Sequence, residues 1–438
     1  MLVKTSRIYF LIAVSILLLN GCGRKDNNSG KVVTITFWHS FVSSTIPSLN
    51  ELIKKFEEEH PGIKIESQYV PSGDPLIQKL VTAIQSGTAP DISWIHSDFL
   101  DKLVEANAIY KMEHFIKGPD GLTDDDMKDI FPALLQSASW RDTLYSMPME
   151  ATTLAFLYNK NMFRKAGLEP NHPPQNWDEL EAYAKKLTLD KNGDGKIDQY
   201  GFYVPVFPAS GPLSIWMVLQ WTPFLWQAGG QEINKQQTQV LFNSNAGVQA
   251  LQLWKDIYNY EHFSNFTMTH DIGFASGTIA MIMDGPWDLP ELRKINKFDW
   301  GVTNLPAGPA AKVTYIDGEH LVIFKQSKHP EAAWTFIKWI LKPEIQAMFS
   351  EQSGYLPVRK SVLQLKEYKN FLDKHPHMKA FVEQLYIGRA RAPIDYHRVE
   401  INQSIAEAVE NSVLGNEDPK TALDEAAMKS NKLLRQKN

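Results

Sequence analysis

Cysteine is the scarcest residue in this sequence, with a single copy, Cys22, in 438 residues. One thiol excludes an intrachain disulfide and any zinc or redox site built on paired cysteines. The fold must therefore be held by hydrophobic cores, and the chain is long enough for two lobes that each have a core of their own.

Long apolar runs are missing too, apart from one of about twelve residues at Ile8 to Leu19, which follows Lys4 and Arg7. This length is typical of a signal peptide and is too short for a permanent membrane-spanning helix. The run ends in Leu-Asn-Gly-Cys22, which resembles the lipobox of bacterial lipoproteins. In that family the thiol carries the lipid, and cleavage removes what are here residues 1–21. The alternative is an ordinary secretory signal with an incidental cysteine.

A strong charge of either sign is also absent. The formal net charge is −5, and it becomes −7 when Lys4 and Arg7 leave with the signal peptide. A mildly acidic exported protein has no electrostatic basis for binding nucleic acid or anionic lipid. The lipid anchor should then be its one membrane contact. Residues 22–31 are the lipidated cysteine and a polar stretch that predicts a flexible tether.

Period-two and helix-period patterns alternate from residue 32 onward. Strands are expected at 32–37, 63–70 and 91–95, and helices at 49–56 and 76–84. A βαβαβ order predicts an α/β fold with a doubly wound, mostly parallel sheet flanked by helices.

Aromatic and hydrogen-bonding residues follow two of these strands. Trp38 and His39 end the first, while Trp94, His96 and Asp98 lie at the end of the third. Ligands of such sheets bind outside the carboxyl ends of the strands, so these five residues are candidate ligand contacts. The alternative is that the tryptophans plug the core and the histidines are structural.

Further candidates lie along the rest of the chain. Glu150 stands between two strand-like segments, where a chain can cross between lobes; its carboxylate either accepts bonds from ligand hydroxyls or is solvated or salt-bridged. An apolar strand at 279–283 ends in Asp284-Gly285-Pro286-Trp287, a turn that would hold the indole rigidly. Residues 210–226 are rich in aromatics, with prolines that should break any long helix.

The segment 190–198 matches the first nine positions of an EF-hand calcium loop. Its oxygen ligands would be Asp190, Asn192, Asp194, the Lys196 carbonyl and Asp198. Gly201 replaces the glutamate of the twelfth position. The prediction is a structural Ca²⁺ that braces a turn; the alternative is a turn rich in Asp, Asn and Gly.

Seven stretches, in this order behind a lipobox, make the chain resemble the extracellular solute-binding lipoproteins of bacterial ABC importers, in their carbohydrate-binding branch. They are ITFWHS (35–40), SGTAPDISW (86–94), FLYNKNMFRKAGL (156–168), PPQNWDELEAYAKKLT (173–188), GTIAMIMDGPW (277–287), SKHPEAAWTFIKWI (327–340) and SGYLPVRKS (353–361).

The resemblance implies two α/β lobes that close like a hinge over ligand. The first lobe would take residues 32–148 and 315–362. The second would take 149–314 and 363–438.

The resemblance also implies roles for single residues. The family's GPW tryptophan falls on Trp287, which would stack on a sugar ring. The ring-stacking and hydroxyl-binding segment of maltose-type members falls on Trp94, His96 and Asp98. The glycine-rich crossover into the first lobe falls on Gly318-Glu319. A C-terminal contact falls near Arg398.

The implied function is a receptor that captures a sugar or oligosaccharide between its lobes and delivers it to the membrane subunits of an ABC permease. It would be a monomer anchored through Cys22 on the extracytoplasmic side of the cell envelope. It would need no cofactor, bind no nucleic acid and catalyse nothing.

Two other interpretations remain open. Relatives with FWHS openings and GYLP turns take glycerol-3-phosphate, and such a ligand, or a glycerophosphodiester, would need cations such as Arg389, Arg391 or Arg398 in the cleft. A secreted carbohydrate-active enzyme would need two carboxylates, for example Glu150 and Asp284.

Overall fold

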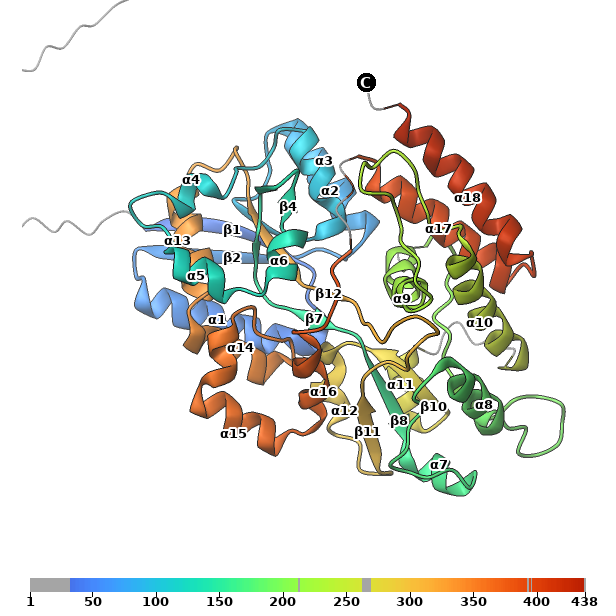
Figure 1. Ribbon diagram of the computed structural model, residues 1–438. Helices are drawn as coiled ribbons and strands as arrows, with labels where there is room; N and C mark the ends of the chain where they lie inside the picture. Colours follow the sequence, from blue (N-terminus) through green and yellow to red (C-terminus); the bar gives the residue numbers. More distant parts are fainter. Residues whose placement is uncertain (1–31, 212, 262–268, 392–393, 395, 437–438) are drawn as a thin grey trace, which may run out of the picture.

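The computed structural model describes residues 32–211, 213–261, 269–391, 394 and 396–436 (Figure 1). Cys22, the predicted signal peptide and the predicted tether lie outside these residues. Among the residues that are described, no helix combines the length and the apolar character that a membrane span requires.

The first lobe is built on a five-stranded sheet in the order β2-β1-β3-β13-β6. Its strands are β1 (Val33–His39), β2 (Ile63–Tyr69), β3 (Ile92–His96), β6 (Met147–Pro148) and β13 (Glu319–Ile323). β1 runs parallel to both β2 and β3. Because β1, β2 and β3 share one direction, their carboxyl ends meet at one edge of the sheet.

The second lobe is built on a four-stranded sheet in the order β11-β8-β10-β9. Its strands are β8 (Ala155–Asn159), β9 (Tyr200–Phe202), β10 (Ile279–Asp284) and β11 (Trp300–Thr303). Every residue of β8 and of β10 is buried, which explains why their sequences are apolar up to the last residue of each strand.

The two-lobed α/β fold is confirmed, but the sheets are mixed rather than mostly parallel. β13 runs antiparallel to β3 and β6, and β8 runs antiparallel to β10 and β11. Both strands directly follow segments that cross between the lobes. β13 therefore starts beside the end of β3, where Glu319 pairs with His96, and β8 starts beside the end of β10, where Ala155 pairs with Asp284.

The crossing segments pair with one another in the middle of the molecule (Figure 1). β7 (Thr152–Thr153) and β12 (Ile316–Asp317) form a short antiparallel pair. Tyr315 forms a further, parallel bridge with Arg389. Three stretches of chain thus lie side by side between the lobes, an arrangement suited to a hinge.

Helices cover both sheets. Around the first lie α1 (Ile46–Glu59), α2 (Asp74–Ser86), α3 (Leu100–Glu105), α4 (Glu113–Ile116), α5 (Asp124–Asp129), α6 (Pro132–Ser137), α13 (Pro330–Ile340), α14 (Pro343–Ser353) and α15 (Lys366–Lys374). The others are α7 (Lys160–Lys165), α8 (Trp177–Leu187), α9 (Ser214–Gln227), α10 (Asn245–Glu261), α11 (His270–Ser276), α12 (Leu289–Leu292), α16 (His377–Gln384), α17 (Arg398–Val413) and α18 (Pro419–Leu434).

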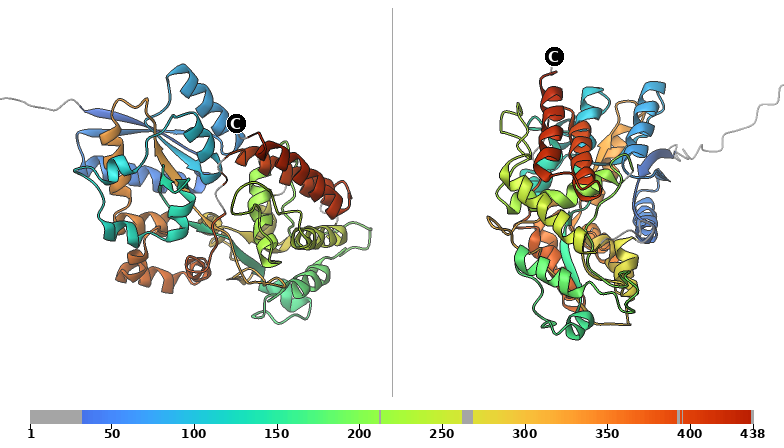
Figure 2. Two further views of the ribbon diagram at one scale, coloured as in Figure 1. Left: turned by 45° about the horizontal axis from the view of Figure 1, so that its top comes forward. Right: turned by 90° about the vertical axis from the view of Figure 1, so that its right-hand side faces the viewer.

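The helices of the C-terminal region do not all pack on the same lobe. α17 and α18 pack side by side along the second lobe (Figure 2). α15 instead packs on α14, beside the first sheet. The lobe boundaries given by sequence, which place 363–438 in the second lobe, stay a prediction.

Short elements complete the fold. They are the strands β4 (Ser139–Trp140) and β5 (Thr143–Leu144), and the 3₁₀ turns η1 (Ser43–Thr45), η2 (Ser97–Phe99), η3 (Pro286–Asp288) and η4 (Lys360–Gln364). η1 of the first lobe and η3 of the second are in contact, so the lobes meet there as well as at the crossing strands.

Candidate ligand-binding cleft

Two adjoining hollows lie between the lobes, with volumes of about 390 Å³ and 590 Å³. They share Val42, Leu213, Trp216, His270 and Trp287 as lining residues and therefore form one continuous space. We call this space the interlobe cleft. Its combined size suits a ligand of one or a few sugar rings.

The strand ends of the first sheet supply one wall of the cleft. Ser40 follows β1, Tyr69 ends β2, and Trp94 and His96 lie in the last three residues of β3. The Trp94 ring is held edge-on by the rings of Phe41 and His96, at centroid distances of 6.0 Å and 4.8 Å. Trp94 and His96 thus lie at the edge where their strand-end positions placed them.

Tryptophans of the second lobe form the opposite wall. Trp287 of η3 meets Trp216 of α9 edge to face, with 5.2 Å between ring centroids, and Tyr355 lies 6.2 Å away. A Cβ atom on Gly285 would come within 1.9 Å of the Trp287 ring. The missing side chain at Gly285 is what lets the indole fold back over the turn.

The crossover segment that follows β12 forms the floor. Gly318 and Glu319 line the cleft, and a Cβ atom on Gly318 would lie 1.9 Å from the carbonyl oxygen of Glu150. The Glu319 N–H donates to Glu150 Oε1 at 3.3 Å. Burial and the adjacent Glu319 carboxylate raise the pKa of Glu150 well above its ordinary value. The Oε2 atoms of Glu150 and Glu319 are buried and have no hydrogen-bond partner, and of these two residues Glu319 lines the cleft.

Asp317 is a fixed negative charge on the same floor. It accepts hydrogen bonds from Ser97 Oγ at 2.5 Å and Tyr315 Oη at 2.8 Å, and it pairs with His320 Nε2 at 3.1 Å. Burial alone would raise the pKa of Asp317, but the bonds from His320 and Ser97 hold it below its usual range.

A histidine and two aspartates meet where the two hollows join. His270 Nε2 lies 3.1 Å from Asp284 Oδ1 and 3.7 Å from Asp288 Oδ2. Burial would lower the pKa of His270, but Asp284 and Asp288 raise it to about 9. Burial and the neighbouring Asp284 raise the pKa of Asp288 to about 8.

The described lining of the cleft contains acidic groups and no lysine or arginine. The acidic residues are Asp271, Asp288, Glu291, Asp317 and Glu319. A ligand with a negative charge would meet repulsion from these groups, and the His270 imidazole of the lining is already paired with Asp284 and Asp288.

Two candidates at the end of β1 lie off the cleft. His39 is buried among the rings of Phe37, Phe41 and Tyr69, and burial lowers its pKa to about 4. Trp38 faces away, with Lys79 Nζ 4.2 Å above its ring. The strand end does reach the cleft, but one residue later than expected.

Asp98 and Arg398 are also off the cleft, because they form ion pairs inside the protein with each other and with Arg391 and Glu232. Arg391 Nη1 lies 3.0 Å from both Asp98 oxygens, and its Nη2 lies 2.5 Å from Glu232 Oε1. Arg398 lies 3.5 Å from Asp98 and 3.4 Å from Glu232. We call these four residues the buried ion cluster. Glu150 likewise lies behind the floor and not on it.

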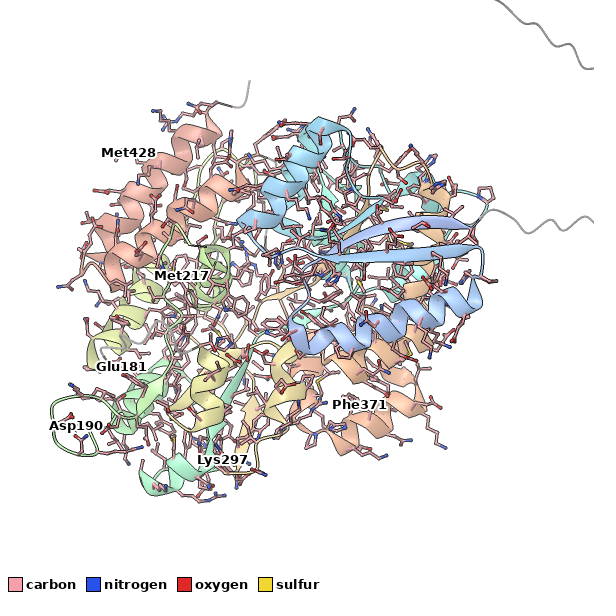
Figure 3. The ribbon with its side chains drawn as sticks, turned by 180° about the vertical axis from the view of Figure 1, so that it is seen from behind. Glu181, Asp190, Met217, Lys297, Phe371 and Met428 are labelled. Atoms are coloured by element: carbon pink, nitrogen blue, oxygen red, sulfur yellow. The ribbon has the colours of Figure 1, made fainter. Side chains whose placement is uncertain are left out.

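The 190–198 segment forms a loop that projects from the edge of the second lobe (Figure 3). The carboxylates of Asp190, Asp194 and Asp198 and the amide oxygen of Asn192 accept hydrogen bonds from backbone N–H groups of the loop, Lys196 N–H among them. These bonds to glycine N–H groups lower the pKa of Asp190. Calcium binding at this loop stays a prediction.

Sequence reasoning overlooked Tyr69, His270 and Tyr355. Tyr69 ends a strand of the first sheet, so the rule that selected Trp94 also applied to it. Tyr355 belongs to the GYLP turn, which served only as a mark of resemblance to known relatives. His270 carries no local signal, because its neighbours Asp284 and Asp288 come from a different strand and turn.

Comparison with known proteins adds the family. The family model for bacterial extracellular solute-binding proteins matches residues 51–380. The chain is 29% identical to a binding protein of Brucella abortus (strain 2308), over 99% of this chain and all of that one. It is 26% identical to the sn-glycerol-3-phosphate-binding periplasmic protein UgpB of Escherichia coli (strain K12), over 93% of this chain and 94% of UgpB.

Among solved structures, an ABC transporter solute-binding protein from Thermotoga lettingae bound with α-D-tagatose is 27% identical, with a TM-score of 0.79. The likeness covers 92% of this chain and all of that one. The agreement extends over both lobes and the segments that cross between them.

Proposed function

The chain belongs to the family of bacterial extracellular solute-binding proteins, and from this premise we propose that it captures a carbohydrate in the interlobe cleft for an ABC importer. The bound sugar passes to the membrane subunits of the permease. The family works outside the cytoplasm, which is where this chain acts.

One observation carries the choice of ligand: the cleft combines opposed aromatic faces with acidic acceptors. Sugar rings expose C–H faces that pack on indole rings, and Trp216 and Trp287 stand across the cleft from Trp94. Hydroxyl groups need acceptors, and Glu319 and Asp317 provide them on the floor. The tagatose-bound relative supports the same ligand class.

Glycerol-3-phosphate is the second candidate, because UgpB of Escherichia coli is a relative over nearly the whole chain. A phosphate ligand calls for cationic side chains. Arg391 and Arg398 are committed to the buried ion cluster, and Arg389 lies 4.8 Å from the Trp226 ring. None of the three lines the described cleft, so the electrostatics favour a neutral sugar.

We further propose that the protein binds without catalysis. The two carboxylates considered for hydrolysis, Glu150 and Asp284, are both buried behind the cleft surface. Neither can reach a glycosidic bond in the way that a pair of catalytic carboxylates must. The related proteins named above are binding proteins.

We also propose that Cys22 anchors the protein by its lipid to the outer face of the membrane. The support is the sequence before it, since the described structure begins at residue 32. Cys22→Ser should release the protein from the membrane fraction, and labelling with a fatty acid should fail in that variant.

The deciding experiment is a titration of tryptophan fluorescence in the mature protein with mono- and oligosaccharides and with glycerol-3-phosphate, followed by product analysis. A saturable change with an unaltered sugar supports the proposal. Tight binding of glycerol-3-phosphate alone overturns the choice of ligand, and cleaved sugar overturns the receptor function.

Trp287→Ala and Trp38→Ala form a matched pair for the same titration. Trp287 lines the cleft and Trp38 does not. Loss of a buried aromatic contact of about 1.5 to 3 kcal/mol should weaken sugar binding roughly 10- to 100-fold in Trp287→Ala. Trp38→Ala should bind as the unaltered protein does.

A further inference from the structure

His270, Asp284 and Asp288 bring three potential metal ligands to one point on the cleft wall. One ligand atom from each lies within 4.8 Å of the other two. Among the residues that the structure describes, no other group of three or more histidine, cysteine, aspartate or glutamate side chains comes together in this way. His270 opens α11, Asp284 ends β10 and Asp288 ends η3. Three separate elements therefore converge, which a run of acidic residues along one loop would not show.

An unsatisfied atom marks the same point. Asp284 is 0% exposed, and its Oδ1 accepts a hydrogen bond from the Gly285 N–H at 2.7 Å. Its Oδ2 is buried and has no hydrogen-bond partner, and His270 Nε2 forms no well-directed hydrogen bond either. Leaving a buried carboxylate oxygen unpaired is costly, so the site is arranged for a partner that the chain itself does not supply.

The charges point to a cation as that partner. Two carboxyl groups, Asp284 and Asp288, face one imidazole, and the Asp271 carboxylate acts on both His270 and Asp288. The described lining of both hollows contains no lysine or arginine that could pair with these carboxyl groups. A divalent cation would pair with both carboxylates at once.

The spacing fits metal coordination. Bonds of about 2.0 to 2.2 Å from a metal to nitrogen and oxygen place neighbouring ligand atoms roughly 3 to 4 Å apart. The imidazole nitrogen lies 3.1 Å and 3.7 Å from the two carboxylate oxygens. His270 and Asp288 also line the larger hollow, which gives an ion a route of entry.

We propose that His270, Asp284 and Asp288 form a binding site for a divalent transition metal such as Zn²⁺, Co²⁺ or Mn²⁺. One imidazole and two carboxylates suit these ions. Three protein ligands leave at least one coordination position open toward the cleft, where water or a ligand hydroxyl can complete it. The site does not depend on which sugar the cleft takes.

The chain offers an internal comparison, because the 190–198 loop presents oxygen atoms alone. An all-oxygen loop selects Ca²⁺, whereas a site with an imidazole ligand prefers transition metals. The two sites lie on different elements, one at the cleft and one on the projecting loop (Figure 3). Their metal preferences and their variants can therefore be told apart.

The test is a titration of the metal-free mature protein with Zn²⁺ by calorimetry and with Co²⁺ by visible absorption. We expect one saturable site whose Co²⁺ spectrum is that of a nitrogen- and oxygen-ligated ion. His270→Gln and Asp288→Asn should weaken Zn²⁺ binding by more than the roughly 10- to 100-fold typical of an outer-shell partner. Asp190→Asn should leave Zn²⁺ binding unchanged.

A second readout needs no change to the ligands. Asp288 directly follows Trp287, so bound Co²⁺ should quench tryptophan fluorescence, and Trp287→Phe should remove most of the quenching while Zn²⁺ still binds. The proposal is overturned if the unaltered protein shows no saturable Zn²⁺ or Co²⁺ binding. It is equally overturned if Asp190→Asn abolishes that binding, or if folded Asp288→Asn retains it in full.

Discussion

At the scale of single residues, Gly285 controls the position of the indole that the proposed function relies on. Gly285→Ala would place a methyl group 1.9 Å from the Trp287 ring, so the ring must move. The ring is the far end of a side chain at the cleft and can move without unfolding the lobe. Sugar affinity should fall about tenfold or more while thermal stability changes little, as measured by fluorescence titration and by calorimetry.

Gly62→Ala is the control for that substitution, because a Cβ atom there meets nothing within 4 Å. It should leave both affinity and stability close to those of the unaltered protein. Equal losses of affinity in Gly285→Ala and Gly62→Ala would show that the loss does not come from a displaced Trp287 ring.

His39 should make the protein sensitive to acid. Burial lowers its pKa from 6.5 to about 4, so the folded state holds the ring neutral while the unfolded chain takes up a proton. Stability from this residue is complete above pH 6.5 and is lost as the pH falls toward 4. At about 1.4 kcal/mol per pKa unit, roughly 2 kcal/mol should be lost between pH 7 and pH 5.

His39→Phe isolates that contribution, since its ring fits among Phe37, Phe41 and Tyr69 and cannot titrate. Urea unfolding of the variant and the unaltered protein at both pH values gives the difference. The exposed His329→Gln is the control. A stability difference for His39→Phe that does not change with pH would contradict the prediction.

At the scale of elements, the buried ion cluster joins η2 of the first lobe to α17 and to Glu232 of the second. Arg391→Met leaves Asp98 and Glu232 buried without their main partner. Removing one member of such a cluster costs about 3 to 5 kcal/mol. Chemical unfolding should show this loss. The exposed pair of Arg164 with Asp299 serves as control, and Arg164→Met should cost less than about 1 kcal/mol.

Elements also show how far sequence reasoning reaches. The βαβαβ start and the strand-end rule placed Trp94 and His96 at the cleft, because both depend on local periodicity. Trp38 and His39 lie off the cleft while Ser40 lines it, since a strand's pattern does not fix which of its last side chains turns inward. Asp98 and Arg398 lie in the buried ion cluster because their partners are far along the chain and only the fold brings them together.

Helix α9 also shows where sequence reasoning stops, because packing outweighs a local signal there. Pro223 was expected to break a helix in this stretch, yet α9 runs through it from Ser214 to Gln227. Nearly every residue of α9 is buried, so packing outweighs the lost backbone hydrogen bond. The same packing decides that Trp221 and Trp226 lie in the core while Trp216 reaches the cleft. An aromatic-rich sequence cannot by itself sort those three.

At the scale of the whole molecule, the cleft draws one wall from each lobe, and the lobes are joined by crossing segments that pair through the short strands β7 and β12 and through the bridge between Tyr315 and Arg389. A sugar that contacts both walls binds best when they are close, so it must favour the closed arrangement. Small-angle X-ray scattering of the mature protein should show a smaller radius of gyration with ligand. At a hundredfold excess over Kd, the ligand should add about 2.7 kcal/mol of stability.

Gly318→Ala tests whether the crossing strands set that closure. A Cβ atom there would lie 1.9 Å from the Glu150 carbonyl oxygen, so the two crossing segments must separate. Because the change alters the floor and the hinge together while leaving both aromatic walls intact, ligand should bind more weakly and the radius of gyration should shrink less. If Gly318→Ala binds sugar and closes as the unaltered protein does, the hinge lies elsewhere. If the unaltered protein binds sugar with no decrease in its radius of gyration, the cleft is already closed before the ligand arrives.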